Sequence, residues 1–136
     1  MENSVPASTS QRFAISHHDE RDFKADGLRA YSTYRDLGVA AATGGLARAH
    51  VIRMVAPFSP ALGGRHHHDV QFQMVYCLKG WFETEFDDGI GVHRLVAGSC
   101  WVQPPGIRHA VRGWSHDCEL LEILMPAEHA TVNDPA

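Results

Sequence analysis

Short runs of β-branched and aromatic residues alternate along this chain with turn-forming Gly, Pro and Asp residues. Runs of this length and composition predict β-strands, and no convincing long amphipathic helix interrupts them. The expected strands cover residues 29–37, 46–56, 70–78, 81–86, 92–96, 100–103, 108–114 and 118–125. Several short strands at this spacing predict an all-β sandwich or a small barrel, and a small barrel can hold one ligand in its mouth.

Turn signals suggest how some of these strands are connected. Lys79-Gly80 predicts a turn that pairs residues 70–78 with 81–86, and Asp87-Asp88-Gly89 predicts a second hairpin. For residues 29–37 a helix stays an alternative, because the helix-tolerant run 39–42 follows them. Residues from Pro126 onward are expected to form a polar tail.

The length of 136 residues fits one compact domain, and a second domain would lack a core of its own. Residues 1–22 are polar and weakly patterned, so we expect a flexible N-terminal arm (1–22) followed by a single domain (23–136). With 44% hydrophobic and 21% charged residues, the composition is typical of a soluble globular protein. No apolar run is long enough to span a bilayer, so we expect no membrane partner.

The formal net charge of −4 and the lack of a Lys/Arg-rich stripe argue against nucleic-acid binding. The N-terminus has neither the basic start nor the apolar segment of a signal peptide, which predicts a cytoplasmic location. Cys77, Cys100 and Cys118 are odd in number and contain no CxxC spacing, so they indicate neither a disulfide framework nor a zinc ribbon. We expect all three to be buried, reduced thiols in strands.

Four potential metal ligands lie between residues 66 and 109, on what we expect to be two hairpins. His66 and His68 would point to the same face of a strand, because side chains repeat every two residues, while His67 would point away to solvent. Gln73 could join them only if the chain bends or bulges between Asp69 and Phe72. His109 follows the rigid corner 104–106 and would add a third imidazole. Three nitrogens suit zinc, iron, copper or nickel and leave positions open for water or substrate.

These residues carry a resemblance to a known family. The pattern His66-x-His68, four residues, Gln73, six residues, Gly80 resembles the first motif of the cupin superfamily. The pattern Gly98, five residues, Pro104-x-Gly106, two residues, His109 is similar to the second cupin motif. The resemblance covers about a third of the chain and implies a β-barrel (a double-stranded β-helix of jelly-roll-like topology) with a divalent metal inside. It also implies pairing into a homodimer through edge strands, for which the N-terminal arm and the early strand are candidates.

The chain departs from the cupin pattern at three positions. Gln73 stands where the motif usually has Glu, Gly113 where it has Asn, and Pro60 where it has Gly. An amide oxygen is a weak ligand without charge, so three neutral imidazoles around a dication would carry one more positive charge than the glutamate version. Such a site should favour an anionic or enolate-like substrate and acidify bound water. Gln73 is either a fourth ligand or a group that hydrogen-bonds a bound water.

The leading hypothesis is a metal-dependent cupin, an oxidoreductase of dioxygenase type that acts on a small anionic or enolisable substrate. Iron is the metal expected first, with zinc, nickel or manganese as alternatives. The same site would also serve a metal-containing binding or sensing module without turnover, or a metal-assisted isomerase or hydrolase. Sequence alone leaves the substrate, the catalytic residues and the existence of turnover open.

A few other residues are weaker candidates for the site. His50, His93, His116 and His129 have no partner at ligand spacing and are interpreted as surface or internally satisfied histidines. Glu119 and Glu122 lie on opposite faces of the last expected strand, so one of them could point inward as a general base. Three arginines could clamp a substrate carboxylate but are more simply surface residues: Arg53, Arg94 and Arg108.

Overall fold

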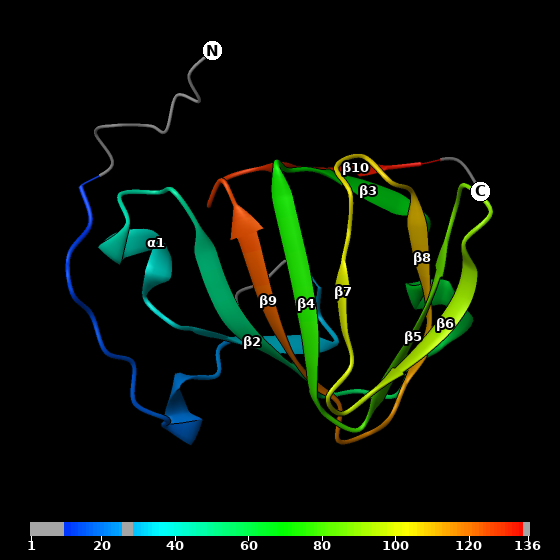
Figure 1. Ribbon diagram of the computed structural model, residues 1–136. Helices are drawn as coiled ribbons and strands as arrows, with labels where there is room; N and C mark the ends of the chain where they lie inside the picture. The colour runs from blue at the N-terminus through cyan, green and yellow to red at the C-terminus, as the bar shows by residue number, and fades with distance from the viewer. Residues whose placement is uncertain (1–9, 26–28, 135–136) are drawn as a thin grey trace, which may run out of the picture.

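The structure, a computed structural model, describes residues 10–25 and 29–134. Two five-stranded antiparallel sheets face each other in a barrel, as Figure 1 shows. One sheet has the order β1 (Ser32–Asp36), β2 (Arg48–Met54), β9 (Glu119–Met125), β4 (Phe72–Lys79) and β7 (Cys100–Val102). The other has the order β10 (Ala130–Asn133), β3 (His66–Asp69), β8 (His109–Trp114), β5 (Trp81–Phe86) and β6 (Gly91–Val96). The predicted all-β barrel of jelly-roll type is confirmed.

The middle of the chain folds as a doubled ribbon. Strand β3 pairs with β8, β4 with β7 and β5 with β6, so the outgoing strands are matched in reverse order by the returning ones. Because β3 and β5 belong to one sheet and β4 to the other, the ribbon crosses between the sheets as it winds. This winding brings the two sequence motifs, 43 positions apart, onto neighbouring strands, with His66 directly opposite His109.

The predicted hairpin between residues 70–78 and 81–86 is therefore wrong, as is the expectation that the four candidate ligands lie on two hairpins. A turn does occur at Gly80, whose φ of 67° favours glycine, but it moves the chain from one sheet to the other. A Cβ at Gly80 would collide with the Ser115 side chain, whose hydroxyl accepts a hydrogen bond from the Trp81 backbone N–H at 2.8 Å. The hairpin predicted at 87–89 is confirmed, because β5 pairs with β6 across it.

The polar tail predicted from Pro126 onward is also wrong. Residues 130–133 form β10, an edge strand whose Thr131 lies opposite His68. Its pattern is hard to recognise in the sequence, because an edge strand next to a polar site has little apolar alternation on either face. Near the other end of the chain, residues 29–37 give a strand over Ser32–Asp36, and the run that follows gives the short helix α1 (Val39–Ala42).

The apolar core lies between the sheets. Trp114 is 6% exposed, stacks on Tyr31 with ring centroids 4.7 Å apart, and donates its indole N–H to the Ala56 carbonyl at 2.8 Å. Phe82 stacks on Trp101 at 6.0 Å, and both rings line the cavity described below. Of the three cysteines, Cys77 and Cys118 are buried free thiols as predicted, but Cys100 is exposed because it begins the edge strand β7.

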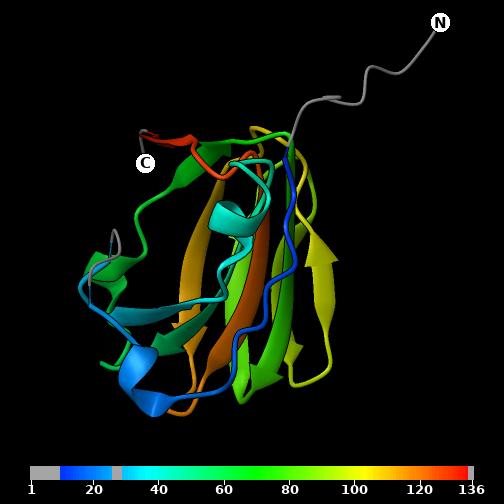
Figure 2. The same ribbon diagram turned by 90° about the vertical axis from the view of Figure 1, so that its left-hand side faces the viewer.

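Residues 10–25 run along the outside of the first sheet (Figure 2). The Arg12 backbone N–H donates to the Ala42 carbonyl at 2.8 Å, and Lys24 forms a β-bridge with Tyr34. Residues 1–9 of the expected arm lie outside the described residues. Among the residues that are described, no helix is long and apolar enough to cross a membrane.

Candidate metal centre and its cavity

Three histidine rings converge inside the barrel. His66 and His68 lie on β3 and His109 on β8, and one ring nitrogen from each lies within 4.8 Å of the others. The ring centroids are 4.2 Å apart for His66 and His109, 4.9 Å for His66 and His68, and 5.2 Å for His68 and His109. The period of two along β3 places the first two rings together, and the β3–β8 pairing adds the third.

Hydrogen bonds fix the tautomer of two of the three rings. The Nδ1 of His66 lies 2.9 Å from the Gly64 carbonyl oxygen, and that of His109 lies 3.1 Å from the Ile107 carbonyl oxygen. The Nδ1 of His68 lies 3.0 Å from the Thr131 hydroxyl. A carbonyl only accepts, so Nδ1 carries the proton in the first two rings and Nε2 keeps its lone pair. Nε2 is thus the nitrogen that these two rings can offer to a metal, although Nε2 of His109 also lies 3.4 Å from Gln103 Nε2. Partners of this kind on Nδ1 are typical of metal-binding histidines.

Burial keeps these rings neutral. It is the main cause that lowers the pKa of His68 to about 3, and the neighbouring His109 and His66 add to it. Burial and His66 together lower the pKa of His109 to about 4, and burial lowers the pKa of His66 as well. Since only a neutral imidazole can bind a metal, the donor set fits a divalent ion at neutral pH.

His67 points away from the cluster, as predicted. It is not a solvated residue, however, because its Nδ1 lies 2.8 Å from a carboxylate oxygen of Asp134 and its side chain is only 26% exposed. Strand β10 and the residue after it thus contact two consecutive histidines, since Thr131 contacts His68 and Asp134 contacts His67.

Gln73 faces the same cavity as the three histidines. The bend required by the sequence pattern is present: β3 ends at Asp69, β4 begins at Phe72 in the other sheet, and Gln73 is 3% exposed. Its amide oxygen accepts a hydrogen bond from Gln103 Nε2 at 3.2 Å. That same nitrogen lies 3.3 and 3.4 Å from the two ring nitrogens of His109. Gln103 therefore lies between Gln73 and the cluster, a contact that the sequence pattern gave no reason to expect.

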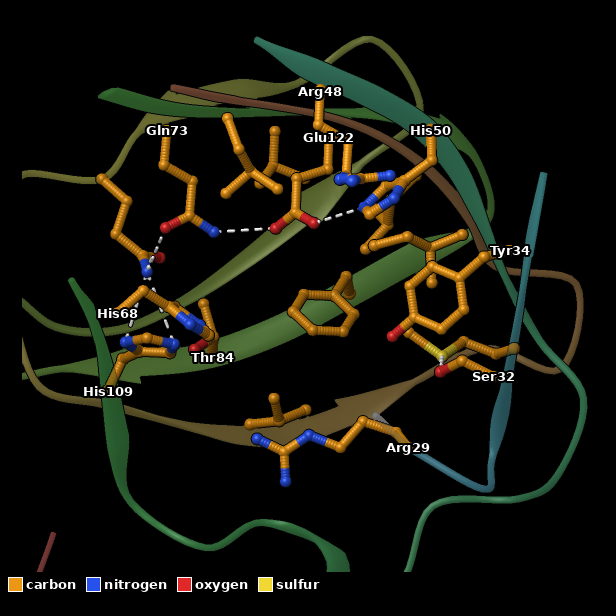
Figure 3. Close-up of a pocket in the computed structure, with 18 of the residues that line it drawn as sticks. Arg29, Ser32, Tyr34, Arg48, His50, His68, Gln73, Thr84, His109 and Glu122 are labelled. Carbon is orange, nitrogen blue, oxygen red and sulfur yellow. Dashed lines mark hydrogen bonds and ion pairs between the residues drawn. The ribbon is translucent and has the colours of Figure 1, made fainter. Parts of the chain in front are cut away.

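Glu122 is the inward carboxylate of β9. Its Oε2 accepts from Gln73 Nε2 at 2.7 Å and its Oε1 lies 2.7 Å from His50 Nε2, as Figure 3 shows. Burial raises the pKa of Glu122, but the hydrogen bonds with His50 and Gln73 outweigh it and the pKa falls below its usual value. A negative charge thus lies one hydrogen bond behind Gln73. The excess positive charge predicted from the missing glutamate is therefore reduced.

A cavity of about 670 Å³ joins these groups. The histidine cluster lies at one end and His50, Tyr34 and Arg48 at the other, with Phe82, Val75 and Leu120 among the apolar walls. Sequence reasoning did not identify most of the polar residues that line this cavity. His50 has no partner at ligand spacing in the sequence, because Glu122 is 72 positions away. His129 lies beside His68 with ring centroids 5.8 Å apart, and its buried Nδ1 has no hydrogen-bond partner among the described residues.

None of the three candidate arginines lines the cavity, which agrees with their simpler interpretation as surface residues. Arg53 pairs with Glu20 and Glu119, and Arg94 with Glu83, all outside the cavity. Arg108 lies 3.5 Å from Asp87 and does not line the cavity either. The arginines that do line it are Arg29 and Arg48.

The remaining departures from the motif have local explanations. Gly113 lies under the Trp81 ring, whose atoms would be 3.3 Å from an added Cβ. Pro60 begins a short 3-10 helix (Pro60–Leu62), a position that needs no backbone N–H. The glycine that the loop requires is Gly63, where a Cβ would collide with the Val111 carbonyl oxygen.

Residues 56–124 match the cupin domain family. The chain belongs to this family. Its fold resembles KdgF from a Halomonas species with a TM-score of 0.66 and 19% identity, over 85% of this chain and 96% of that one. It also resembles the polyketide cyclase RemF from Streptomyces resistomycificus, with a TM-score of 0.69 and 19% identity over 90% and 87% of the two chains.

A third similar structure is a salicylate 1,2-dioxygenase variant from Pseudoaminobacter salicylatoxidans in complex with gentisate. Its TM-score is 0.60 at 10% identity, and the match covers 80% of this cupin chain but 31% of the dioxygenase. At these identities the likeness establishes the fold alone. No curated protein sequence matches this chain.

Proposed function

We propose that this cupin is a metal-dependent oxidoreductase of dioxygenase type, acting on a small anionic or enolisable substrate. The observation that carries the proposal is the convergence of the His66, His68 and His109 rings at one end of a cavity, with an oxygen atom beside each Nδ1. Three facial nitrogens leave coordination positions open for small molecules.

The proposed metal is iron, with zinc, nickel and manganese as alternatives that the same donors accept. An iron ion held by the three imidazoles would supply the oxygen chemistry. Gln73 is proposed as a weak fourth ligand or as a hydrogen-bond partner of a metal-bound water. Its present contacts with Gln103 and Glu122 support the second role, because they already use its oxygen and one of its N–H groups.

The cavity supports a small, negatively charged substrate. Its volume of about 670 Å³ is in the range typical of small-molecule sites. Arg29 lies across it from Glu122 in Figure 3, and its guanidinium makes no hydrogen bond or ion pair with the described residues. After burial, its positive charge is among the causes that lower the pKa of both His66 and His109. A guanidinium near the cluster suits a substrate carboxylate.

Two measurements test the proposal. Elemental analysis of protein purified without added metal should find about one metal ion per chain, with iron the main component. Oxygen uptake should follow when the Fe(II) protein meets a member of a panel of β-dicarbonyls, catechols, hydroxybenzoates and thiols. Uptake should disappear in His109→Ala and persist in His67→Ala, which alters the neighbouring ring that faces away. Equal uptake by both variants would place the reaction elsewhere.

A metal-assisted isomerase or hydrolase is the second candidate, favoured by the His50–Glu122 pair, which a purely redox reaction does not need. A full metal content without oxygen uptake across the panel would favour this candidate or a binding module over the dioxygenase.

We also propose a homodimer. Edge strand β1 is already bridged by Lys24 on its outer side, so it supports pairing less than expected. The opposite edges, β6 and β7, expose Val92, Val96 and Val102 by 53%, 53% and 61%. Light scattering should give twice the chain mass, and Val102→Lys should lower it; an unchanged mass would argue against this interface. The cytoplasmic location stays a prediction.

A further inference from the structure

The far end of the cavity contains a histidine–carboxylate pair that the proposed metal centre does not use. His50 on β2 and Glu122 on β9 lie opposite each other in the strand register, with Nε2 and Oε1 2.7 Å apart. Both side chains are largely buried, with 14% and 16% exposed. Both line the cavity, and the Tyr34 ring packs edge-on against the His50 ring with centroids 5.0 Å apart.

The hydrogen bonds orient the His50 ring. The two oxygens of an ionised Glu122 only accept, so Nε2 of His50 donates to Oε1 while Oε2 accepts from Gln73. The basic lone pair of the neutral ring then lies on Nδ1. That nitrogen makes no hydrogen bond with any residue that the structure describes. An oriented imidazole with one free nitrogen at a cavity wall is the arrangement that general-base catalysis requires.

A second pair on the same two strands shows what a structural pair looks like here. Arg53 and Glu119 are also opposite each other in the β2–β9 register, three positions along from His50 and Glu122. Their side chains lie 3.0 Å apart on the outer face and do not line the cavity. A pair on the outer face, such as Arg53 and Glu119, is enough to support the pairing of the two strands. Burying a charged pair inside the barrel adds little net stability. The inner pair therefore points to chemistry in the cavity.

We propose that His50 is a general base that takes a proton from a C–H group next to the carbonyl of an enolisable carboxylate substrate, and that Glu122 is its positioning residue. The C–H bond breaks and its electron pair stays on the substrate as the enolate, while a new N–H bond forms at Nδ1. Glu122 compensates the charge of the resulting imidazolium, which exchanges its proton with water and then returns a proton to the same carbon. Arg29 would hold the substrate carboxylate. This inference rests on the proposed function, because it places the substrate in the same cavity.

Deuterium exchange tests the proposal without oxygen. The protein with its native metal content is incubated under argon in D₂O with pyruvate or 2-oxobutyrate, and loss of the C3 proton signal is followed by NMR. The wild-type protein should accelerate exchange on the order of a hundredfold over buffer, the lower range for a positioned base. His50→Gln should lose nearly all of this acceleration, while Glu119→Gln should keep it. Equal exchange by wild type and His50→Gln, or none by wild type, would overturn the proposal.

A second readout does not depend on turnover. Nitrogen-15 NMR of histidine-labelled protein should show His50 protonated at Nε2 and free at Nδ1. Glu122→Gln should change that signature and lower exchange, while Glu122→Asp should restore both in part. A signature insensitive to Glu122→Gln would remove Glu122 from the positioning role, and unchanged circular dichroism in every variant would show that the fold is kept.

These results separate the two proposals. Exchange that depends on His50, without oxygen uptake, would keep the base and remove the dioxygenase. Oxygen uptake that is the same in wild type and His50→Gln would keep the dioxygenase and remove the base.

Discussion

The two ends of the cavity use the same side chain in different surroundings. At one end, His66, His68 and His109 have neutral oxygen partners on Nδ1, no carboxylate contact, and lowered pKa values. At the other end, His50 contacts the carboxylate of Glu122 directly. Burial, with the mutual crowding of the rings, keeps the three histidines neutral as lone-pair donors, whereas Glu122 fixes the orientation of the His50 ring by a direct hydrogen bond. The neighbours, not the residue type, separate ligation from acid–base chemistry.

The two ends are nevertheless connected along the cavity wall. Starting from His50, contacts of 2.7, 2.7, 3.2 and 3.4 Å run through Glu122, Gln73 and Gln103 to Nε2 of His109. Each member comes from a different part of the chain. A change at one end therefore alters the hydrogen bonding of the next member, which allows the comparison to be tested by substitution.

The largest expected effect comes from removing a ring of the cluster. His109→Ala should lower metal affinity on the order of a hundredfold or more, because losing a ligand costs more than the 10- to 100-fold typical of losing a ligand's hydrogen-bond partner. Metal titration with a competing chelator measures it. His50→Gln should leave affinity within about threefold if the ends have separate roles, given that it contacts none of the three rings.

His67→Ala is the matched control on β3, since its ring faces Asp134 rather than the cavity. Equal metal loss in His67→Ala and His109→Ala would show a general loss of structure. A metal content unchanged in His109→Ala would contradict the proposed centre.

The next largest effect is expected from changing the contact between Gln73 and Glu122, which lies between the two ends of the cavity. Gln73→Glu replaces the 2.7 Å hydrogen bond to Glu122 with two facing carboxylates, so one must be protonated or the pair repels. We expect a loss of about 2 kcal/mol in the free energy of unfolding, as for an uncompensated buried group. Urea denaturation measures it.

The double variant Gln73→Glu/Glu122→Gln restores one amide and one carboxylate with their positions exchanged. It should recover most of the lost stability. Metal affinity should rise about tenfold over wild type, because the negative charge moves one hydrogen bond closer to the cluster. A Gln73→Glu variant that is as stable as wild type would contradict the contact between these two side chains.

The sequence predicted the three-histidine cluster better than the other polar residues that line the cavity. His66, His68 and His109 followed from a period of two and from motif spacing, both of which are local properties. The inward carboxylate was narrowed to Glu119 or Glu122 by alternation along one strand, but only the sheet packing selects Glu122. His50 could not be recognised, because its partner lies on a strand 72 positions away.

The pairing of most strands is another feature that local sequence signals could not predict. The signal at Gly80 predicted a turn correctly, yet whether a turn joins partners or changes sheets depends on distant strands. Strand β5 takes β8 and β6 as neighbours, and β4 takes β9 and β7. Local propensity cannot encode that choice, so the fold class, most strands and the 87–89 hairpin were predicted while the other strand pairings were not.

The smallest expected effect is the pH dependence of stability in the metal-free protein. The folded pKa of His68 is about 3, below its ordinary value of 6.5, so between these values the unfolded chain binds a proton that the folded chain does not. Stability should therefore fall as pH drops below about 6.5 and level off only near the folded pKa. From pH 7 to pH 5 full linkage would remove about 2 kcal/mol, and the cavity's solvent reduces the His68 share to about 1 kcal/mol. Urea denaturation of wild type and His68→Gln at both pH values measures this share, since the variant should show the smaller decrease. Identical decreases would mean that His68 is as easily protonated in the folded protein as in the unfolded chain, and the distinction between the two ends of the cavity would then lose its electrostatic basis.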